Sequence, residues 1–260
     1  MHGQRNHIIV TVLVLAICFA GCRKEDKPAT ISFEFTHSVG TRTFIKDSLL
    51  YVNAAGNHYE VNDLQYFVSE IILNKADGEK IAITADKGIH YVDIDIPGTL
   101  NWTIGQEIPT GEYISVSFIF GIDEAKNKTG LFVNPPERDM FWPEPMGGGY
   151  HYMKMNGQWL DTLNQLTPFN FHIGIGMENM ALIQNYFTVQ VPNSGVYITS
   201  GSGPKLILNM DIANWFETPN LWNWNVIGGQ IMQKQWAMRM AAENGADAFT
   251  CEWVNKTGAK

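Results

Sequence analysis

Soft metal ligands are concentrated in one stretch, "MFWPEPMGGGYHYMKMNGQW" at 140–159, which holds four Met, two Trp and one His. Within it, His151 alternates with Met153 and Met155. Side chains two positions apart along a strand lie on one face, so this spacing would present an imidazole and two thioethers together. Imidazole suits copper and thioether favours Cu(I), which makes the set a plausible copper site. The competing interpretation is a structural histidine with its hydrogen bonds satisfied inside the protein.

Two other histidines are candidate ligands from distant segments. His172 lies in "FNFHIGI" and is opposite in phase to the apolar residues of that segment, while His37 closes the apolar face of "ISFEFTH". His58 falls in a turn and His90 at the start of a strand pattern, and both are expected to be structural. We therefore rank His172 and His151 first and His37 third, because spacing along the chain does not show that they converge.

The loop before His151 contains a conformationally restricted segment followed by a flexible one. Trp142 begins a Trp-Pro-Glu-Pro segment whose prolines restrict the backbone, and the glycines at 147–149 permit positive φ or a close approach of the backbone. One interpretation is a rigid aromatic loop that leads into the His/Met strand. The other is a well-packed hairpin whose aromatic side chains cover the edge of the core.

The elements that must position these residues are mostly short strands. Apolar and polar residues alternate in "ISFEFTH" at 31–37 and in "EYISVSFIFG" at 112–121, where Ile114 is expected to face inward with the other apolar residues. Pro, Gly and Asn clusters separate such segments at short intervals. This pattern predicts an all-β protein, an antiparallel β-sandwich of the immunoglobulin-like or jelly-roll type.

Two segments have helical features. In "NDLQYFVSEIIL", Asp63 could cap a short helical turn before a strand at 68–73. The segment 228–245 predicts a C-terminal helix, because Met232, Trp236 and Met240 recur every four residues and Asn-Gly follows as a stop signal.

The N-terminus has the features of a bacterial lipoprotein. An apolar segment follows Arg5 and ends in Ala-Gly-Cys, so 1–21 is expected to be a signal peptide and Cys22 to carry lipid. We expect 22–29 to be a tether and 30–260 to form one β-sandwich domain with its C-terminal helix. This arrangement predicts an outer-membrane lipoprotein, on the periplasmic face or at the cell surface, whose only link to the membrane is the lipid anchor.

Composition and motifs exclude several classes of protein. The formal net charge of −8 argues against nucleic acid as a partner. Once the signal peptide is removed and Cys22 is acylated, Cys251 remains alone and no intrachain disulfide can form. Because no nucleophile motif or paired acid and base is readable, we expect a binding protein and not an enzyme.

An alternative function is a glycan-binding or nutrient-binding surface module that uses exposed indoles, with these candidates: Trp215, Trp222, Trp224, Trp236 and Trp253.

Six segments follow one another along the chain in a recognisable order and spacing, namely "VNDLQYFVSEIIL", "YVDIDIPG", "GEYISVSFIFGI", "MFWPEPMGGGYHYMKMNG", "FNFHIGIG" and "GGQIMQKQWAMRMAAENGADAF". Their order and spacing resemble the MbnP-like copper-binding family, which is related to the MopE and CorA surface copper proteins. The resemblance runs over about 31–250. It implies a secreted all-β scaffold that holds copper through histidines.

The resemblance also assigns individual residues. Trp142 matches the Trp of the family's Met-Phe-Trp segment, and His172 matches the His of its His-Leu/Ile-Gly strand. In some members a tryptophan is oxidised to kynurenine by a di-haem peroxidase-like partner, so Trp142 is the candidate for oxidation. Glu144 stands where many members have a second tryptophan, and the family's four-cysteine pattern is absent. The sequence thus predicts a lipid-anchored protein for copper capture, storage or delivery.

Overall fold

The computed structural model describes residues 27–254. The predicted signal peptide, Cys22 and most of the predicted tether lie outside the described residues. Between residues 27 and 254, no helix has the length and apolar character needed to cross a membrane.

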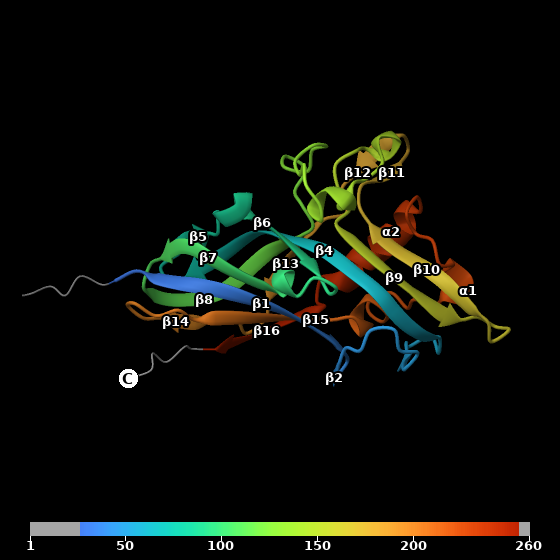
Figure 1. The fold of residues 1–260 in the computed structure, drawn as a ribbon, viewed down its shortest axis with the longest axis horizontal. Helices are drawn as coiled ribbons and strands as arrows, with labels where there is room; N and C mark the ends of the chain where they lie inside the picture. The colour runs from blue at the N-terminus through green and yellow to red at the C-terminus, as the bar shows by residue number, and fades with distance from the viewer. Residues whose placement is uncertain (1–26, 255–260) are drawn as a thin grey trace, which may run out of the picture.

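Two β-sheets pack face to face (Figure 1). The first contains β16 (Phe249–Val254), β15 (Lys205–Asp211), β1 (Ala29–Val39) and β2 (Arg42–Thr43) in that order, with β7 (Asn101–Ile108) also paired to β1. The second has the order β10 (Leu166–Ile173), β9 (Met153–Leu160), β4 (His58–Lys75), β8 (Gly111–Phe120) and β13 (Phe187–Val191). Its shorter strands are β14 (Val196–Ile198) on β8, and β3 (Tyr51–Val52), β5 (Lys80–Ala82) and β6 (Ile89–Asp93) on β4.

A small hairpin and several helices complete the described chain. The hairpin pairs β11 (Gly176–Glu178) with β12 (Ala181–Ile183). The α-helices are α1 (Trp224–Ile227) and α2 (Gln235–Gly245), and the 3-10 helices are η1 (Ala85–Gly88), η2 (Pro97–Leu100), η3 (Glu137–Met140), η4 (Glu144–Met146) and η5 (Ala213–Phe216). The predicted β-sandwich with a helix near the C-terminus is confirmed, although β1 and β15 pair in parallel.

The period of two in the sequence defines the core well, with one local exception. Phe33 and Phe35 of β1 are buried, as their alternation predicts. In β8, however, Ile114 is exposed and Tyr113 is buried instead. The register between β4 and β8 shifts at this point, so β8 contains an extra residue that turns Ile114 to the outside.

Of the two helical predictions, the helical turn at Asp63 is wrong and the C-terminal helix is shorter than predicted. No helix forms near Asp63, because β4 runs as one long strand through the whole segment and pairs on both sides. The helix predicted for 228–245 begins only at Gln235. Its buried face is formed by Ala237, Met238 and Ala241, whereas Trp236 is half exposed. The helix ends at Gly245, as the Asn-Gly signal predicts, and β16 follows it.

Candidate metal centre

Strand β9 separates its side chains between the two faces of the second sheet. Met153 and Met155 are fully buried on the inner face, where their register partners on β10 are Ile173 and Phe171. Lys154 is paired with His172 in the same register and lies with it on the outer face. The structure therefore places Met153 and Met155 in the core, on the opposite side of the sheet from His172.

His151 joins the outer face because the chain bends before the strand begins. Tyr152 forms a bend, and its backbone N–H donates to the carbonyl of Ile173. This change of direction ends the alternation that the sequence suggests between His151 and Met153. The ring of His151 instead meets the ring of His172, with 5.1 Å between centroids and an interplanar angle of 85°.

Trp142 forms the wall of this histidine pair. Its indole is completely buried and meets the His151 ring edge-on, with 4.6 Å between centroids. The loop folds back here through a bridge between Phe141 and Tyr150, and a Cβ on Gly174 would lie 2.5 Å from the indole. Residues 147–149 all have positive φ, at 116°, 68° and 79°, which is the freedom that three consecutive glycines supply.

Hydrogen bonds set the tautomer of each imidazole. Nδ1 of His151 lies 2.9 Å from the carbonyl oxygen of Met140, which can only accept, so Nδ1 carries the proton. Nε2 of His172 lies 2.8 Å from Oδ1 of Asn156 and donates to it. These bonds leave the lone pairs on Nε2 of His151 and Nδ1 of His172. A hydrogen bond from the other ring nitrogen is the usual arrangement for a histidine that binds metal.

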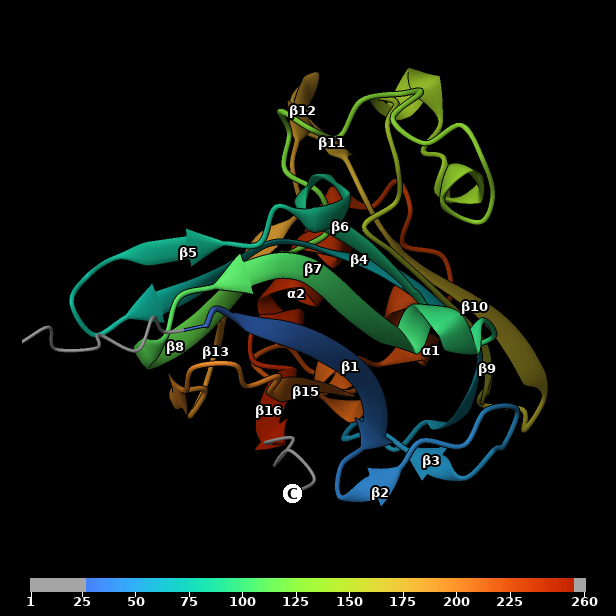
Figure 2. The same cartoon turned by 60° about the vertical axis from the view of Figure 1, so that its left-hand side comes forward.

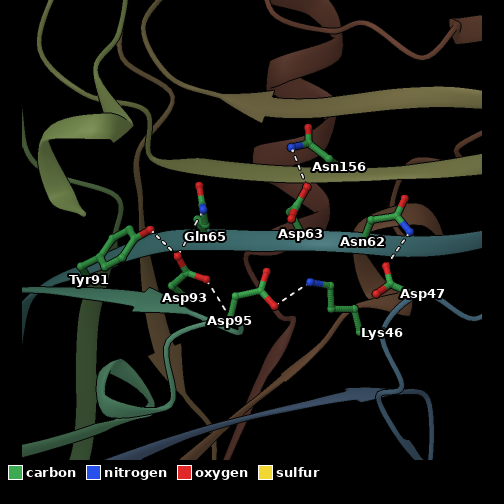
Figure 3. A network of polar contacts seen from close by, with 9 residues as sticks. All are labelled: Lys46, Asp47, Asn62, Asp63, Gln65, Tyr91, Asp93, Asp95 and Asn156. Carbon is green, nitrogen blue, oxygen red and sulfur yellow. Dashed lines mark hydrogen bonds and ion pairs between the residues drawn. The ribbon is translucent and has the colours of Figure 1, made fainter. Parts of the chain in front are cut away.

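Asn156 is itself held by the second sheet. Its Nδ2 donates to a carboxylate oxygen of Asp63 on β4 at 3.4 Å, and this fixes which end of the amide faces His172 (Figure 3). Figure 3 shows that the pair belongs to a polar row along β4, with Gln65 and Asp93 bonded further along the same strand region. Within this row, Asp63 orients Asn156, and Asn156 orients the ring of His172.

Both imidazoles are neutral near pH 7. Burial, followed by the positive charge of Lys154, lowers the pKa of His151 to about 3 and that of His172 to about 4. Burial also lowers the pKa of Lys154, whose Nζ donates to the carbonyl of Asp139 at 2.6 Å. Neutral imidazole is the form that binds metal, whereas the nearby ammonium opposes a second positive charge. This electrostatic setting favours an ion of low charge.

His37 lies elsewhere. It follows Phe35 on the inward face of β1, and its Nε2 lies 3.1 Å from the hydroxyl of Tyr66, which pairs with Met153 on the inner face of the second sheet. Burial lowers the pKa of His37 to about 4. The structure brings His151, His172 and Trp142 together and leaves His37 on the other side of the sheet. Among residues 27–254, no group of three His, Cys, Asp or Glu side chains could hold a metal ion.

The tryptophans proposed for the alternative function are mostly core residues. Trp215, Trp222 and Trp224 are almost completely buried. Trp253 is partly buried and donates through Nε1 to the carbonyl of Ser194. Trp236 alone of the five is exposed, at 50%. In the part of the chain that the structure describes, these five residues therefore form no multi-indole platform for sugars.

The comparisons with known proteins agree with this architecture. The sequence model of the MbnP family matches residues 28–233, so the chain belongs to the MbnP family. Among solved structures, MbnP from Methylosinus trichosporium is similar with a TM-score of 0.53 and 10% identity, over 86% of this chain and 98% of that one. At this identity the likeness shows a shared fold. No curated protein matches the sequence.

Sequence reasoning missed the residues that orient the histidines. Asn156 stands in an Asn-Gly pair, a pattern typical of turns, and Asp63 is predicted to cap a helix, but both lie in strands and bond to each other. The available signal was the period of two, which places Asn156 in phase with Lys154. The carbonyl of Met140 leaves no side-chain signal that a sequence could reveal.

Proposed function

We propose that the chain binds copper between His151 and His172 and serves in metal capture, storage or delivery without turnover. The observation that carries this proposal is a pair of neutral imidazoles, 5.1 Å apart between centroids, each with one nitrogen hydrogen-bonded and the other carrying a lone pair. A metal ion bound by the free nitrogen of each ring would lie about 2.0–2.1 Å from both nitrogens. Membership of the MbnP family supports a metal-related role.

Copper fits this donor set better than zinc. Structural zinc sites use four protein ligands and catalytic ones three, with Cys, His or carboxylates as donors. The described chain offers two imidazoles at this place and no third ligand of those types. Cu(I) forms stable low-coordinate complexes with imidazole, and its single charge is repelled less by Lys154 than that of a divalent ion.

The setting of this site is part of the proposal. The apolar N-terminal segment that ends in Ala-Gly-Cys at Cys22 supports an outer-membrane lipoprotein, facing the periplasm or the cell surface. Mass spectrometry of the chain purified from membranes should find an acylated residue 22 at the N-terminus, and an unprocessed chain would contradict this.

Trp142 is the proposed site of oxidation to kynurenine by a di-haem peroxidase-like partner. Its place against His151 supports the assignment, because a change in the indole would alter the wall of the site. Peptide mass spectrometry of chain isolated with and without such a partner should find the oxidation at Trp142 alone and only with the partner. Unmodified Trp142 in both samples would rule it out.

Calorimetric titration of Cu(I) and Cu(II) into the full chain tests copper binding. We expect a saturable Cu(I) site that is strongly weakened by His151→Ala or by His172→Ala. His37→Ala should leave the affinity unchanged, because that ring lies across the sheet. A wild-type affinity no better than that of the two site variants would end the proposal.

Asn156→Ala should weaken copper binding about 10–100-fold, the usual loss when the partner that orients a metal-binding histidine is removed. The variant keeps both imidazoles but frees the ring of His172 to rotate. The same titration measures the effect. Asn170→Ala is the matched control, since Asn170 lies opposite Asn156 on β10 but bonds to Gln230 instead of a histidine. Equal affinities in the two variants would show that Asn156 does not position the ligand.

A further inference from the structure

A group of soft ligands lines a cavity next to Trp142, the residue that packs against His151. The cavity has a volume of about 460 Å³ and lies between η4 and the β11–β12 hairpin. Three methionines from these two segments line it, namely Met146, Met177 and Met180, together with Gln233 from the segment before α2. Figures 1 and 2 both show the hairpin and the loop that contains η4 rising on the same side of the sandwich.

These methionines differ from the ones in the core. Met153 and Met155 are fully buried, as expected of side chains that fill space. Met177 and Met180 are 51% and 95% exposed, so packing does not explain why a large apolar side chain occupies either position. Both residues nevertheless line the cavity.

The hairpin holds Met180 in an unfavourable conformation. Glu178 pairs with Ala181, so Asn179 and Met180 form a two-residue turn with φ of 51° and 63°. Glycine is the favoured residue at the second position of such a turn, and a non-glycine residue there is uncommon. The positive φ of Met180 is energetically unfavourable, and burial of the side chain does not offset it. A strained position of this kind indicates a function for the thioether.

Met146 is fixed at the opposite wall. Nε1 of Trp142 donates to its carbonyl oxygen at 3.1 Å, and Gly147 follows it with a positive φ of 116°. Nε2 of Gln233 lies 3.9 Å from its sulfur. Met146 thus connects the cavity to the indole that packs against His151.

We propose that Met146, Met177 and Met180 bind a soft monovalent metal ion, Cu(I) or Ag(I), as a second site distinct from the histidine pair. Thioethers are uncharged and soft, so they select such ions in preference to Zn²⁺ or Mg²⁺. Each side chain is unbranched with three rotatable bonds, which lets sulfur atoms from two segments converge on one ion. The assignment does not depend on copper binding at the histidines.

Titration of Ag(I) into chain labelled with ¹³C at the methionine methyl groups tests this site. Cys251 is replaced by serine, because it is the thiol expected to remain once the signal peptide is removed and Cys22 is acylated. Resonances of Met146, Met177 and Met180, assigned with single Met→Leu variants, should shift together and saturate. Met153 and Met155 should not shift. The His151→Ala/His172→Ala variant should show the same three shifts, so failure of the histidine site and failure of this one are distinguishable.

Calorimetry with Ag(I) and Cu(I) supplies the second measurement. The triple Met→Leu variant of the site keeps the side-chain volumes and should lose this binding event. The matched control, Met153→Leu/Met155→Leu, should retain it. Fewer than three shifting resonances, or unchanged binding by the triple variant, would overturn the proposal and leave the cavity as an apolar surface.

Discussion

Trp142→Ala is expected to lower the free energy of unfolding by about 3–5 kcal/mol, the usual cost of truncating a buried tryptophan. The indole has no exposed surface, and it fills the space between His151 and the backbone at Gly174. Removing it leaves a cavity that this backbone cannot close. The same change should weaken copper binding, because the His151 ring loses its wall. Urea unfolding and Cu(I) calorimetry measure the two effects.

Trp236→Ala is the matched control for this prediction. It removes the same side chain from a position that is 50% exposed on α2. We expect a loss of stability below about 1 kcal/mol and no effect on copper binding. Similar losses in the two variants would mean that Trp142 is not the tightly packed wall described above.

Acid should destabilise the metal-free chain steeply. Burial lowers the pKa of His37 to about 4 in the folded state, whereas the unfolded value is about 6.5. As the pH falls from 6.5 towards 4, His37 becomes protonated in the unfolded chain but stays neutral in the folded chain. The free energy of unfolding therefore falls by about 1.4 kcal/mol per pH unit for this one group.

His151 and His172 add contributions of the same sign, since their folded pKa values are about 3 and about 4. Together these three histidines should lower the free energy of unfolding by about 4 kcal/mol per pH unit between about pH 6 and pH 4. A domain with a typical stability of about 5–15 kcal/mol would unfold inside or just below this window. Stability from these groups is complete above about pH 6.5.

Urea unfolding at a series of pH values, with a chelator present, measures this slope. His37→Phe should reduce the slope by about 1.4 kcal/mol per pH unit, because the group that contributes this amount is removed. His58→Gln, which removes an exposed histidine, is the control for the substitution itself. If His37→Phe retains the full slope, the imidazole of His37 does not contribute to the acid sensitivity.

The fold could be predicted from the sequence where the cause is local. Alternation in β1 identifies Phe33 and Phe35 as core residues because successive side chains of a strand always face opposite ways. The prediction failed where a neighbouring strand decides the outcome. Ile114 turns outward because β8 has an extra residue opposite β4. The segment around Asp63 is a strand because β9 pairs with it and β6 pairs with it from Gln65 onward.

The candidate site shows the same division. The sequence by itself determined which donors the chain possesses, and it singled out His151, His172 and Trp142 by residue type and by resemblance to the MbnP-like family. Only the tertiary structure decided their arrangement. A bend at Tyr152 moves His151 away from the methionines, and the β9–β10 register brings His172 to it. Residue type and strand period are properties of the local chain, whereas contacts between strands depend on register and bends that distant residues impose.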